Sequence, residues 1–215
     1  MKRLALLGAG GHGKVVADAA LASGWDIVEF YDDAWPGRTV NGHWPVLGDT
    51  AMLVQRAGEY EGVAVSIGNC AIRWERQLIL RAAGAKLATI VHPRSWVSPF
   101  ARLGPGTVVM AGGVINTDAV IGDAGIVNSD ATVDHDCVLA HAVHVTPGAH
   151  LLGDVVVGAQ SWIGVGAVAR QGSRIGSNVI VGAGAVVVQD IPDGITVIGN
   201  PARPMAKKDK LERVL

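Results

Sequence analysis

From Val97 to Val187 an aliphatic residue opens nearly every successive group of six residues. Fifteen of the sixteen openings are Val, Ile or Leu, and Ala169 is the exception. In a helix this spacing would drift around the axis, and a simple strand would alternate every two residues. A short flat strand and a turn in each group satisfy the pattern, and such a repeat indicates a solenoid.

Three groups of six make a triangular coil of 18 residues, with the opening aliphatic residues stacked inside. The chain has 29 glycines but only two Phe and two Tyr, which fits a fold made largely of tight turns. The sequence therefore predicts a left-handed parallel β-helix over residues 89–194. We expect the tail, residues 195–215, to cap the open coil, with MAKKDKLERVL forming a short amphipathic helix.

Residues 1–88 follow a different pattern, in which short apolar runs alternate with helical segments. This alternation predicts a small Rossmann-like parallel α/β domain, so the fold class is α/β followed by β. The expected strands are 4–7, 27–31 and 63–67, and the expected helices are 13–22 and 72–83.

A glycine-rich loop follows the first expected strand. Gly8, Gly10 and Gly13 match G-x-G-x-x-G, a context in which helix amides hold phosphate. Asp32 and Asp33 end the second strand at the distance typical of a ribose-binding acid. Because 88 residues form only about half of a dinucleotide-binding fold, the pattern favours a bound nucleotide over NAD. The alternative is a tight turn that needs glycine only for packing.

Two further residues lie at the same edge of the predicted sheet. His12 is inside the glycine loop, where it would bond a sugar or phosphate oxygen or cap the helix. Gly68 ends the third strand at the carboxyl edge, where open α/β sheets bind ligands.

Polar side chains gather in the middle of the repeat. His135 occupies the third place of its group, an outward corner, and Asp136 follows it. An imidazole held by a carboxylate is suited to accept a proton at neutral pH, so we interpret the pair as a candidate base. The alternative is that both are ordinary polar residues at a corner of the coil. Cys137 would point away from His135 and is expected to pack inside. The other members of the cluster are Asn128, Asp130, Asp134, His141, His144 and His150.

Four of these histidines raise the possibility of zinc. Their spacings of six, three and six differ from the ligand pattern of a solenoid-type carbonic anhydrase, so we expect no metal. The 18 basic and 19 acidic side chains nearly cancel, which argues against binding to nucleic acid or to an anionic membrane. Two isolated cysteines and the absence of a long apolar segment predict a cytoplasmic protein.

Several motifs together resemble the sialic acid O-acetyltransferase/PglD-like family, and the resemblance covers the whole chain. They are GAGGHGK, YDD, SIGN, NSDATVDHDCVLAHAVHVTPGA and IGNPARP. The resemblance implies a homotrimer that transfers acetyl from acetyl-CoA, held between adjacent subunits, to a nucleotide-linked 4-amino sugar.

The resemblance also implies roles for individual residues. His135 is the catalytic base, and Asp136 raises its basicity, although the family commonly has Glu at that place. The residues implied to contact acetyl-CoA are His144, Val165 and Ala183. Those implied to contact the nucleotide sugar are Gly10, Gly11, His12, Asp32, Asp33 and Gly68.

The resulting hypothesis is direct transfer, in which His135 removes a proton from the attacking sugar amine. Because no loop interrupts the repeat, we expect the N-terminal domain to cover the site and present its ligand to His135. Two alternatives stay open: an O-acetyltransferase acting on a sugar or sialic acid hydroxyl, and a non-catalytic nucleotide-binding trimer. The sequence leaves UDP, GDP and dTDP as possible carriers.

Overall fold

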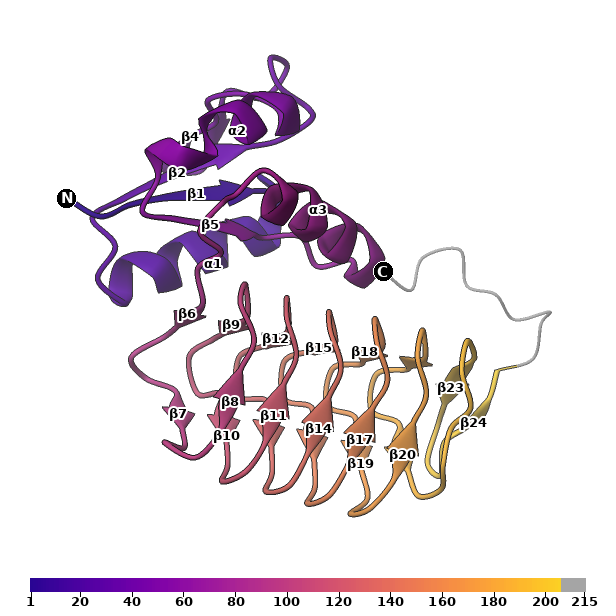
Figure 1. Cartoon of the computed structure of the whole chain (residues 1–215). Coiled ribbons are helices and arrows are strands. Elements are labelled where there is room, and N and C mark those ends of the chain that lie inside the picture. Colours follow the sequence, from indigo (N-terminus) through magenta and orange to yellow (C-terminus); the bar gives the residue numbers. More distant parts are fainter. Residues whose placement is uncertain (206–215) are drawn as a thin grey trace.

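The computed structural model describes residues 1–205, which form a small α/β domain seated on a long three-sided solenoid (Figure 1). The capping helix expected near the end of the chain lies outside these residues.

The N-terminal domain is a parallel sheet with helices packed on it. Its strands are β1 (Arg3–Leu7), β2 (Ile27–Tyr31) and β5 (Gly62–Val65), in the order β2-β1-β5. The helices are α1 (Gly11–Ala22) and α3 (Cys70–Ala82). Each element expected from the sequence is present within two residues of its predicted bounds.

Between β2 and β5 lie elements that the sequence analysis did not predict. They are the hairpin β3 (Val40–Asn41) and β4 (Trp44–Pro45), the helix α2 (Thr50–Arg56) and the 3₁₀ turn η1 (Ala57–Glu59). Asp49 caps α2 by accepting a hydrogen bond from the Met52 amide at 2.8 Å. A seven-residue helix shows too few turns for helical periodicity to stand out in a sequence.

The solenoid is a left-handed parallel β-helix with three faces. The first face contains β6 (Ile90–Val91), β9 (Val108–Val109), β12 (Ile126–Val127), β15 (His144–Val145), β18 (Trp162–Ile163), β21 (Ile180–Val181), β23 (Thr196–Ile198) and the antiparallel β24 (Arg203–Pro204). The second contains β7 (Trp96–Val97), β10 (Val114–Ile115), β13 (Thr132–Val133), β16 (His150–Leu151), β19 (Val168–Ala169) and β22 (Val186–Val187). The third contains β8 (Arg102–Leu103), β11 (Val120–Ile121), β14 (Val138–Leu139), β17 (Val156–Val157) and β20 (Arg174–Ile175).

The register along each face is 18 residues, as in the pairing of Ile115 with Val133 and of Val133 with Leu151. The aliphatic residues that open the groups point inward, and all except Val97 and Leu103 are buried. Each buried aliphatic side chain contributes about 1.5–3 kcal/mol. The fifth residue of each group is mostly small and is buried as well, as at Ala119, Ala131 and Ala149, which suits the narrow interior.

The turns between faces require a left-handed backbone at the fourth place of most groups. Eight non-glycine residues adopt it, with φ between 54° and 60°, including Asp118, Asp136 and Asp154. Aspartate and asparagine tolerate this conformation better than most residues. The fold therefore places Asp136 at a fixed point of a rigid turn.

Close stacking of the coils predicts a specific sensitivity to added volume. A Cβ atom at Gly122 would lie 2.7 Å from the Ala140 carbonyl carbon, which is backbone and cannot move aside. We expect Gly122→Ala to lower the free energy of unfolding by about 1–3 kcal/mol in thermal or urea denaturation. Gly58→Ala is the control, since a Cβ there meets nothing within 4 Å. Equal stability of the two variants would contradict this packing.

Candidate active site

A buried arginine joins the two domains. Arg73 of α3 is 1% exposed, and its guanidinium donates to the carbonyls of Ala124 and Ala142, both at 2.8 Å. These alanines occupy equivalent turns in successive coils. The same group donates to the carbonyls of Ile67 and Gly68 at 2.9 and 2.8 Å. Arg73 therefore links the loop after β5 directly to the solenoid.

Other side chains of α3 contact the same corner of the solenoid, between the third and first faces. Gln77 donates to the Pro105 carbonyl at 2.9 Å, and Arg81 forms an ion pair with Asp123. Trp74 stacks on His141, with ring centroids 4.1 Å apart. Because residues four apart share one side of a helix, Arg73, Gln77 and Arg81 act together as the docking side of α3.

The glycine loop leaves the first turn of α1 accessible. A Cβ atom at Gly10 or Gly11 would meet nothing within 4 Å, whereas one at Gly13 would collide with the Gly8 carbonyl oxygen. Gly8 also has φ +112°, a left-handed value that suits glycine. Gly8 and Gly13 thus shape the loop, while Gly10 and Gly11 leave open space in front of the helix amides.

The two aspartates after β2 have partners within the domain. Asp32 accepts hydrogen bonds from the amides of Ala9, at 2.7 Å, and Ala34, at 2.9 Å. Asp33 accepts from the Thr50 amide at 3.0 Å and pairs with Arg76 at 3.0 Å. Hydrogen bonding to Thr50 is the main cause of the lowered pKa of Asp33. Both carboxylates hold the loops, and contact with a nucleotide stays a prediction.

Two neutral histidines lie close together, His12 within the glycine loop and His144 on the first face of the solenoid. The pKa of His144 is lowered to about 3 and that of His12 to about 4, chiefly by burial and also by the nearby Arg73 charge. His144 Nδ1 lies 3.2 Å from the Gly68 carbonyl oxygen, and its Nε2 lies 3.1 Å from the Asn128 amide nitrogen. This network assigns the proton to Nδ1. The two rings are 5.9 Å apart, so His12, Gly68 and His144 are brought together.

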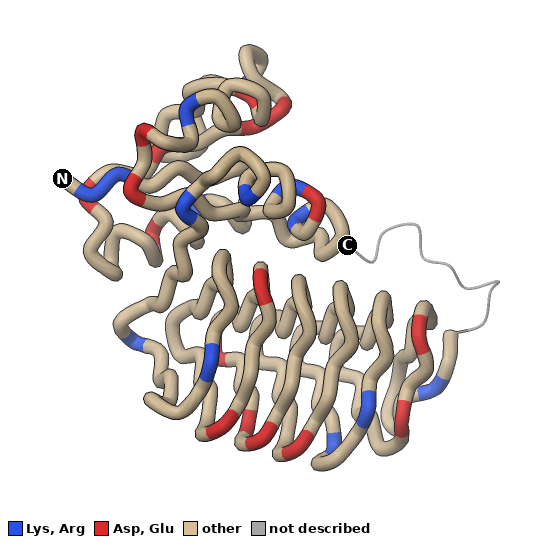
Figure 2. Tube along the Cα trace, in the orientation of Figure 1, with Lys and Arg blue, Asp and Glu red and all other residues tan. Residues whose placement is uncertain are grey.

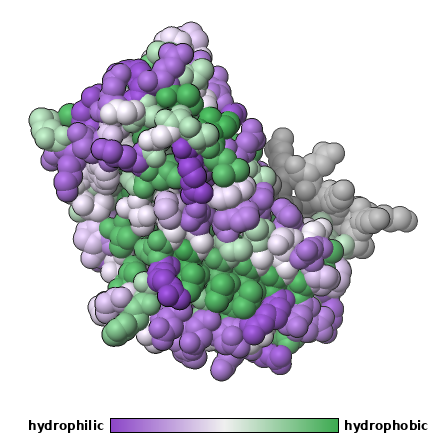
Figure 3. Space-filling model, viewed as in Figure 1, coloured by the Kyte–Doolittle hydropathy of each residue, from purple (hydrophilic) through white to green (hydrophobic). Residues whose placement is uncertain are grey.

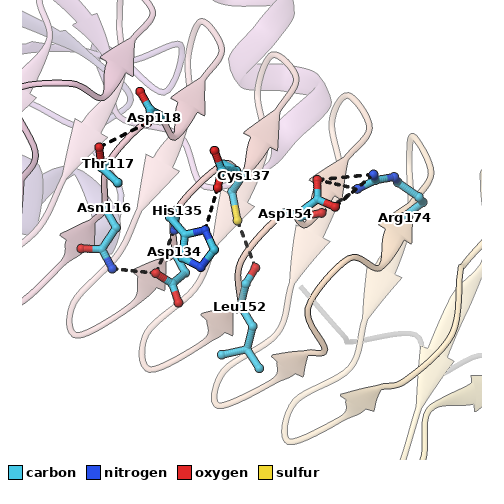
Figure 4. A network of polar contacts seen from close by, with 10 residues as sticks. Asn116, Thr117, Asp118, Asp134, His135, Cys137, Leu152, Asp154 and Arg174 are labelled. Atoms are coloured by element: carbon cyan, nitrogen blue, oxygen red, sulfur yellow. Dashed lines mark hydrogen bonds and ion pairs between the residues drawn. The ribbon is translucent and has the colours of Figure 1, made fainter.

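His135 and Asp136 lie at another corner, which joins the second and third faces between β13 and β14 (Figure 4). His135 Nδ1 is 2.7 Å from Asp136 Oδ2, and this hydrogen bond is the main cause of the raised pKa of His135. Asp134 Oδ1 accepts from the His135 amide and from the Asn116 side chain, both at 2.8 Å. With the Nδ1 proton held by Asp136, Nε2 is the atom that can accept a proton.

His135 borders a groove of about 570 Å³ on the second face. Trp96 and Phe100 form exposed apolar walls, 59% and 71% accessible, at the first coil. The remaining lining residues are Ser98, Pro99, Asn116, Thr117 and Asp134. Aromatic side chains beside amide and carboxylate groups suit a small polar molecule with an apolar side.

The nucleotide-site candidates and His135 are far apart within one chain. The domain rests on the first face and the corner beside it, whereas the turns that carry His135 form the opposite edge of the solenoid (Figure 1). Acidic residues are frequent along that lower edge (Figure 2). The expectation that the domain presents its ligand to His135 is therefore wrong for a single chain.

The remaining candidates lie at the third corner of the solenoid, between the first and second faces. Val165 and Ala183 are exposed and occupy equivalent places in successive coils, where the Gly184 amide donates to the Val165 carbonyl at 2.8 Å. Both residues are separate from His144, which is buried under the domain. The contacts of these three residues with acetyl-CoA stay predictions.

Cys137 does not compete with His135 as a reactive group. Its thiol is buried and donates to the Leu152 carbonyl at 3.1 Å. Burial raises its pKa to about 11, which leaves almost no thiolate at neutral pH. Within residues 1–205, no group of three His, Cys, Asp or Glu side chains is arranged to hold a metal ion.

Arg73 is the main site residue that the sequence analysis missed. The available signal was an arginine and a glutamine four residues apart on the side of α3 that also carries the buried Leu80. A polar pair at buried helical positions indicates partners outside the helix.

A left-handed β-helix of six-residue groups, with a histidine hydrogen-bonded to a carboxylate at one corner, is typical of an acyltransferase of the hexapeptide-repeat class. The family described as the PglD N-terminal domain matches residues 3–77. GDP-perosamine N-acetyltransferase of Escherichia coli O157:H7 is 32% identical over 184 residues, which cover 83% of this chain and 82% of the relative. The chain belongs to the PglD/PerB-type sugar N-acetyltransferases.

Two solved structures are similar over nearly their whole length. The acetyltransferase domain of PglB from Neisseria gonorrhoeae FA1090, in complex with acetyl coenzyme A, is 47% identical with a TM-score of 0.91, covering 95% of this chain and 99% of that one. PerB from Caulobacter crescentus, in complex with CoA and GDP-perosamine, is 39% identical with a TM-score of 0.91, covering 96% and 98%. The described part of this chain has no helix that is both long and apolar enough to span a membrane.

The buried histidines predict a loss of stability in acid. Below pH 6.5 the unfolded chain binds protons at His12 and His144. In the folded chain these imidazoles are protonated only near their lowered pKa values of about 4 and about 3. The free energy of unfolding should therefore fall as the pH drops from about 6.5 to about 4. Urea denaturation of the wild type and of His12→Gln/His144→Gln across this range measures the effect. A double variant that loses stability as steeply as the wild type would contradict the assignment.

Proposed function

We propose that this chain transfers the acetyl group of acetyl-CoA to the 4-amino group of a nucleotide-linked 4-amino-deoxy sugar. The acceptor is a UDP-4-amino-4,6-dideoxy sugar or GDP-perosamine. The observation that supports it most directly is the His135–Asp136 pair, which leaves Nε2 free to accept a proton at a corner where His135 lines an open groove. The likeness to structures that contain acetyl-CoA, or CoA with GDP-perosamine, supports this choice of donor and acceptor.

In the proposed reaction the neutral amine attacks the thioester carbonyl, so that a C–N bond forms and the C–S bond breaks. His135 Nε2 accepts the proton that leaves the nitrogen and returns it to the departing thiolate, so no covalent enzyme intermediate is needed. Main-chain amides of the turns stabilise the oxyanion. Asp136 keeps the proton on Nδ1 and favours the charged imidazolium that forms during the transfer.

The acceptor class is tested by a CoA-release assay. UDP-, GDP- and dTDP-linked 4-amino sugars are each compared with the matched 4-hydroxy sugar, and the product is identified by mass spectrometry. We expect acetylation of one or more amino sugars and none of the hydroxy sugars. Transfer to a hydroxyl alone, or no binding of acetyl-CoA in calorimetry, would contradict the proposal.

The role of His135 predicts a defined pattern of rates. We expect His135→Asn to lower kcat/KM by about 10²-fold or more, since a positioned base contributes about 10²–10⁴-fold. Asp136→Asn removes the main cause of the raised pKa of His135, so the acidic limb of the kcat/KM profile should move to lower pH and the plateau should fall. Asp118→Asn, at the equivalent turn one coil earlier, is the matched control. Full activity of both site variants would exclude this role.

We propose that the active unit is a homotrimer in which the domain of one subunit approaches His135 of the next. The separation of the two sites within one chain supports an assembly. The third face offers a flat apolar surface, formed by Val120, Val138 and Val156 with Gly122 and Gly158 beside them, and Val138 is 44% exposed. Figure 3 shows apolar residues gathered on the solenoid below the domain.

This surface predicts an effect on assembly. We expect Val138→Asp to shift the protein toward monomers in light scattering coupled to size exclusion, with loss of acetyl transfer, because the carboxylate would lose its hydration at the interface. Val40→Asp is the control, since Val40 is 59% exposed on the β3–β4 hairpin. An unchanged trimer for Val138→Asp would rule out the third face as an interface.

The two cysteines of the chain are free, as is usual for a protein in a reducing compartment, and acetyl-CoA is a cytoplasmic metabolite. We therefore place the proposed activity in the cytoplasm.

A further inference from the structure

We infer that Gly153 is a positioning residue for the proposed base, because it gives the His135 imidazole the space in which it lies. This inference rests on the proposed function. A Cβ atom built on Gly153 would lie 2.5 Å from both Cε1 and Nε2 of His135, and 3.2 Å from Nδ1. The ring therefore rests directly against the Gly153 backbone in the next coil.

The backbone itself does not demand glycine at this place. Gly153 is not among the glycines with positive φ. Residues 117, 135, 153 and 171 occupy the same corner place in successive coils, and Thr117 and Gln171 carry ordinary side chains there. The missing side chain at residue 153 is thus explained by the imidazole that occupies its space, and not by the turn.

The neighbouring hydrogen bonds make this contact rigid. The Asp154 amide donates to the His135 carbonyl at 2.9 Å, and the Gly172 amide donates to the Gly153 carbonyl at 2.9 Å. The first bond ties the coil of His135 to the coil of Gly153, and the second ties the coil of Gly153 to the coil after it. The clash between a methyl group at residue 153 and the imidazole would be relieved by rotation of the His135 side chain, since the backbone of neither coil is free to move.

Rotation of the ring would have two consequences. It would break the 2.7 Å hydrogen bond from Nδ1 to Asp136, which is the main support of the raised pKa of His135. It would also displace Nε2, and a displacement of about 1 Å in a reacting group costs about 10²-fold in rate. Gly153 and Asp136 therefore fix the imidazole from two sides.

The test is Gly153→Ala in the assembled enzyme. We expect kcat to fall at least 10-fold while the KM for acetyl-CoA stays within twofold, and the acidic limb of kcat/KM to move to lower pH. Titration of His135 followed by NMR should show the same lowered pKa without any turnover. Gly58→Ala is the control, because its φ is not positive and its added methyl would meet nothing within 4 Å.

A second variant separates positioning from general damage to the coil. Removal of the ring in His135→Ala leaves room for the methyl, so Gly153→Ala should cause no further loss of activity or of melting temperature in that background. An unchanged pH profile and kcat in Gly153→Ala would overturn the inference while the proposed function stands. Full activity of His135→Asn would instead overturn the proposed function, whatever Gly153→Ala does.

Discussion

The 18-residue register of the coils is the constraint on which the rest of the protein depends. Each coil repeats the same backbone path, so a residue on one turn stands directly over its equivalent on the next, as Gly153 stands against His135. Burial of the inward aliphatic residues stabilises this stack, and the parallel strand pairing along the three faces fixes the orientation of each coil on the next. Side chains at the corners are therefore positioned by the whole stack and need no supporting loop.

The attachment of the N-terminal domain uses the same regularity. Arg73 binds the carbonyls of Ala124 and Ala142, which are available because both alanines adopt the left-handed turn conformation. The guanidinium also binds the Gly68 carbonyl, so the loop after β5 is tied to the stack. Neutral His144 completes the contact by donating to the same carbonyl. Domain orientation thus follows from these turn contacts together with apolar packing, in which Val16 of the domain shares a buried cluster with Val108 and Met110 of the solenoid.

The sequence predicted the solenoid, the α/β domain and most element bounds, because the period of six and the strand–helix alternation are local patterns. It also placed His135 and Asp136 on one turn, which needs only adjacency in the chain. It did not predict α2, which is too short to show periodicity, or the docking by Arg73, whose partners lie 51 and 69 residues away. It expected the domain to present its ligand to His135 but did not say in which subunit, since periodicity does not tell which face a preceding domain covers.

The distance between the glycine loop and His135 within one chain has a genetic consequence in the proposed trimer. Each polypeptide supplies its loop to one catalytic centre and its imidazole to another. Consider one variant that lacks His135 and another with a disrupted glycine loop, each inactive alone. Mixing them would restore some catalytic centres, because some subunit interfaces would combine an intact glycine loop with an intact His135. A single polypeptide carrying both lesions would disable two centres in every ring it joins. Activity would thus depend on which subunits are neighbours in the trimer, and not on any one chain alone.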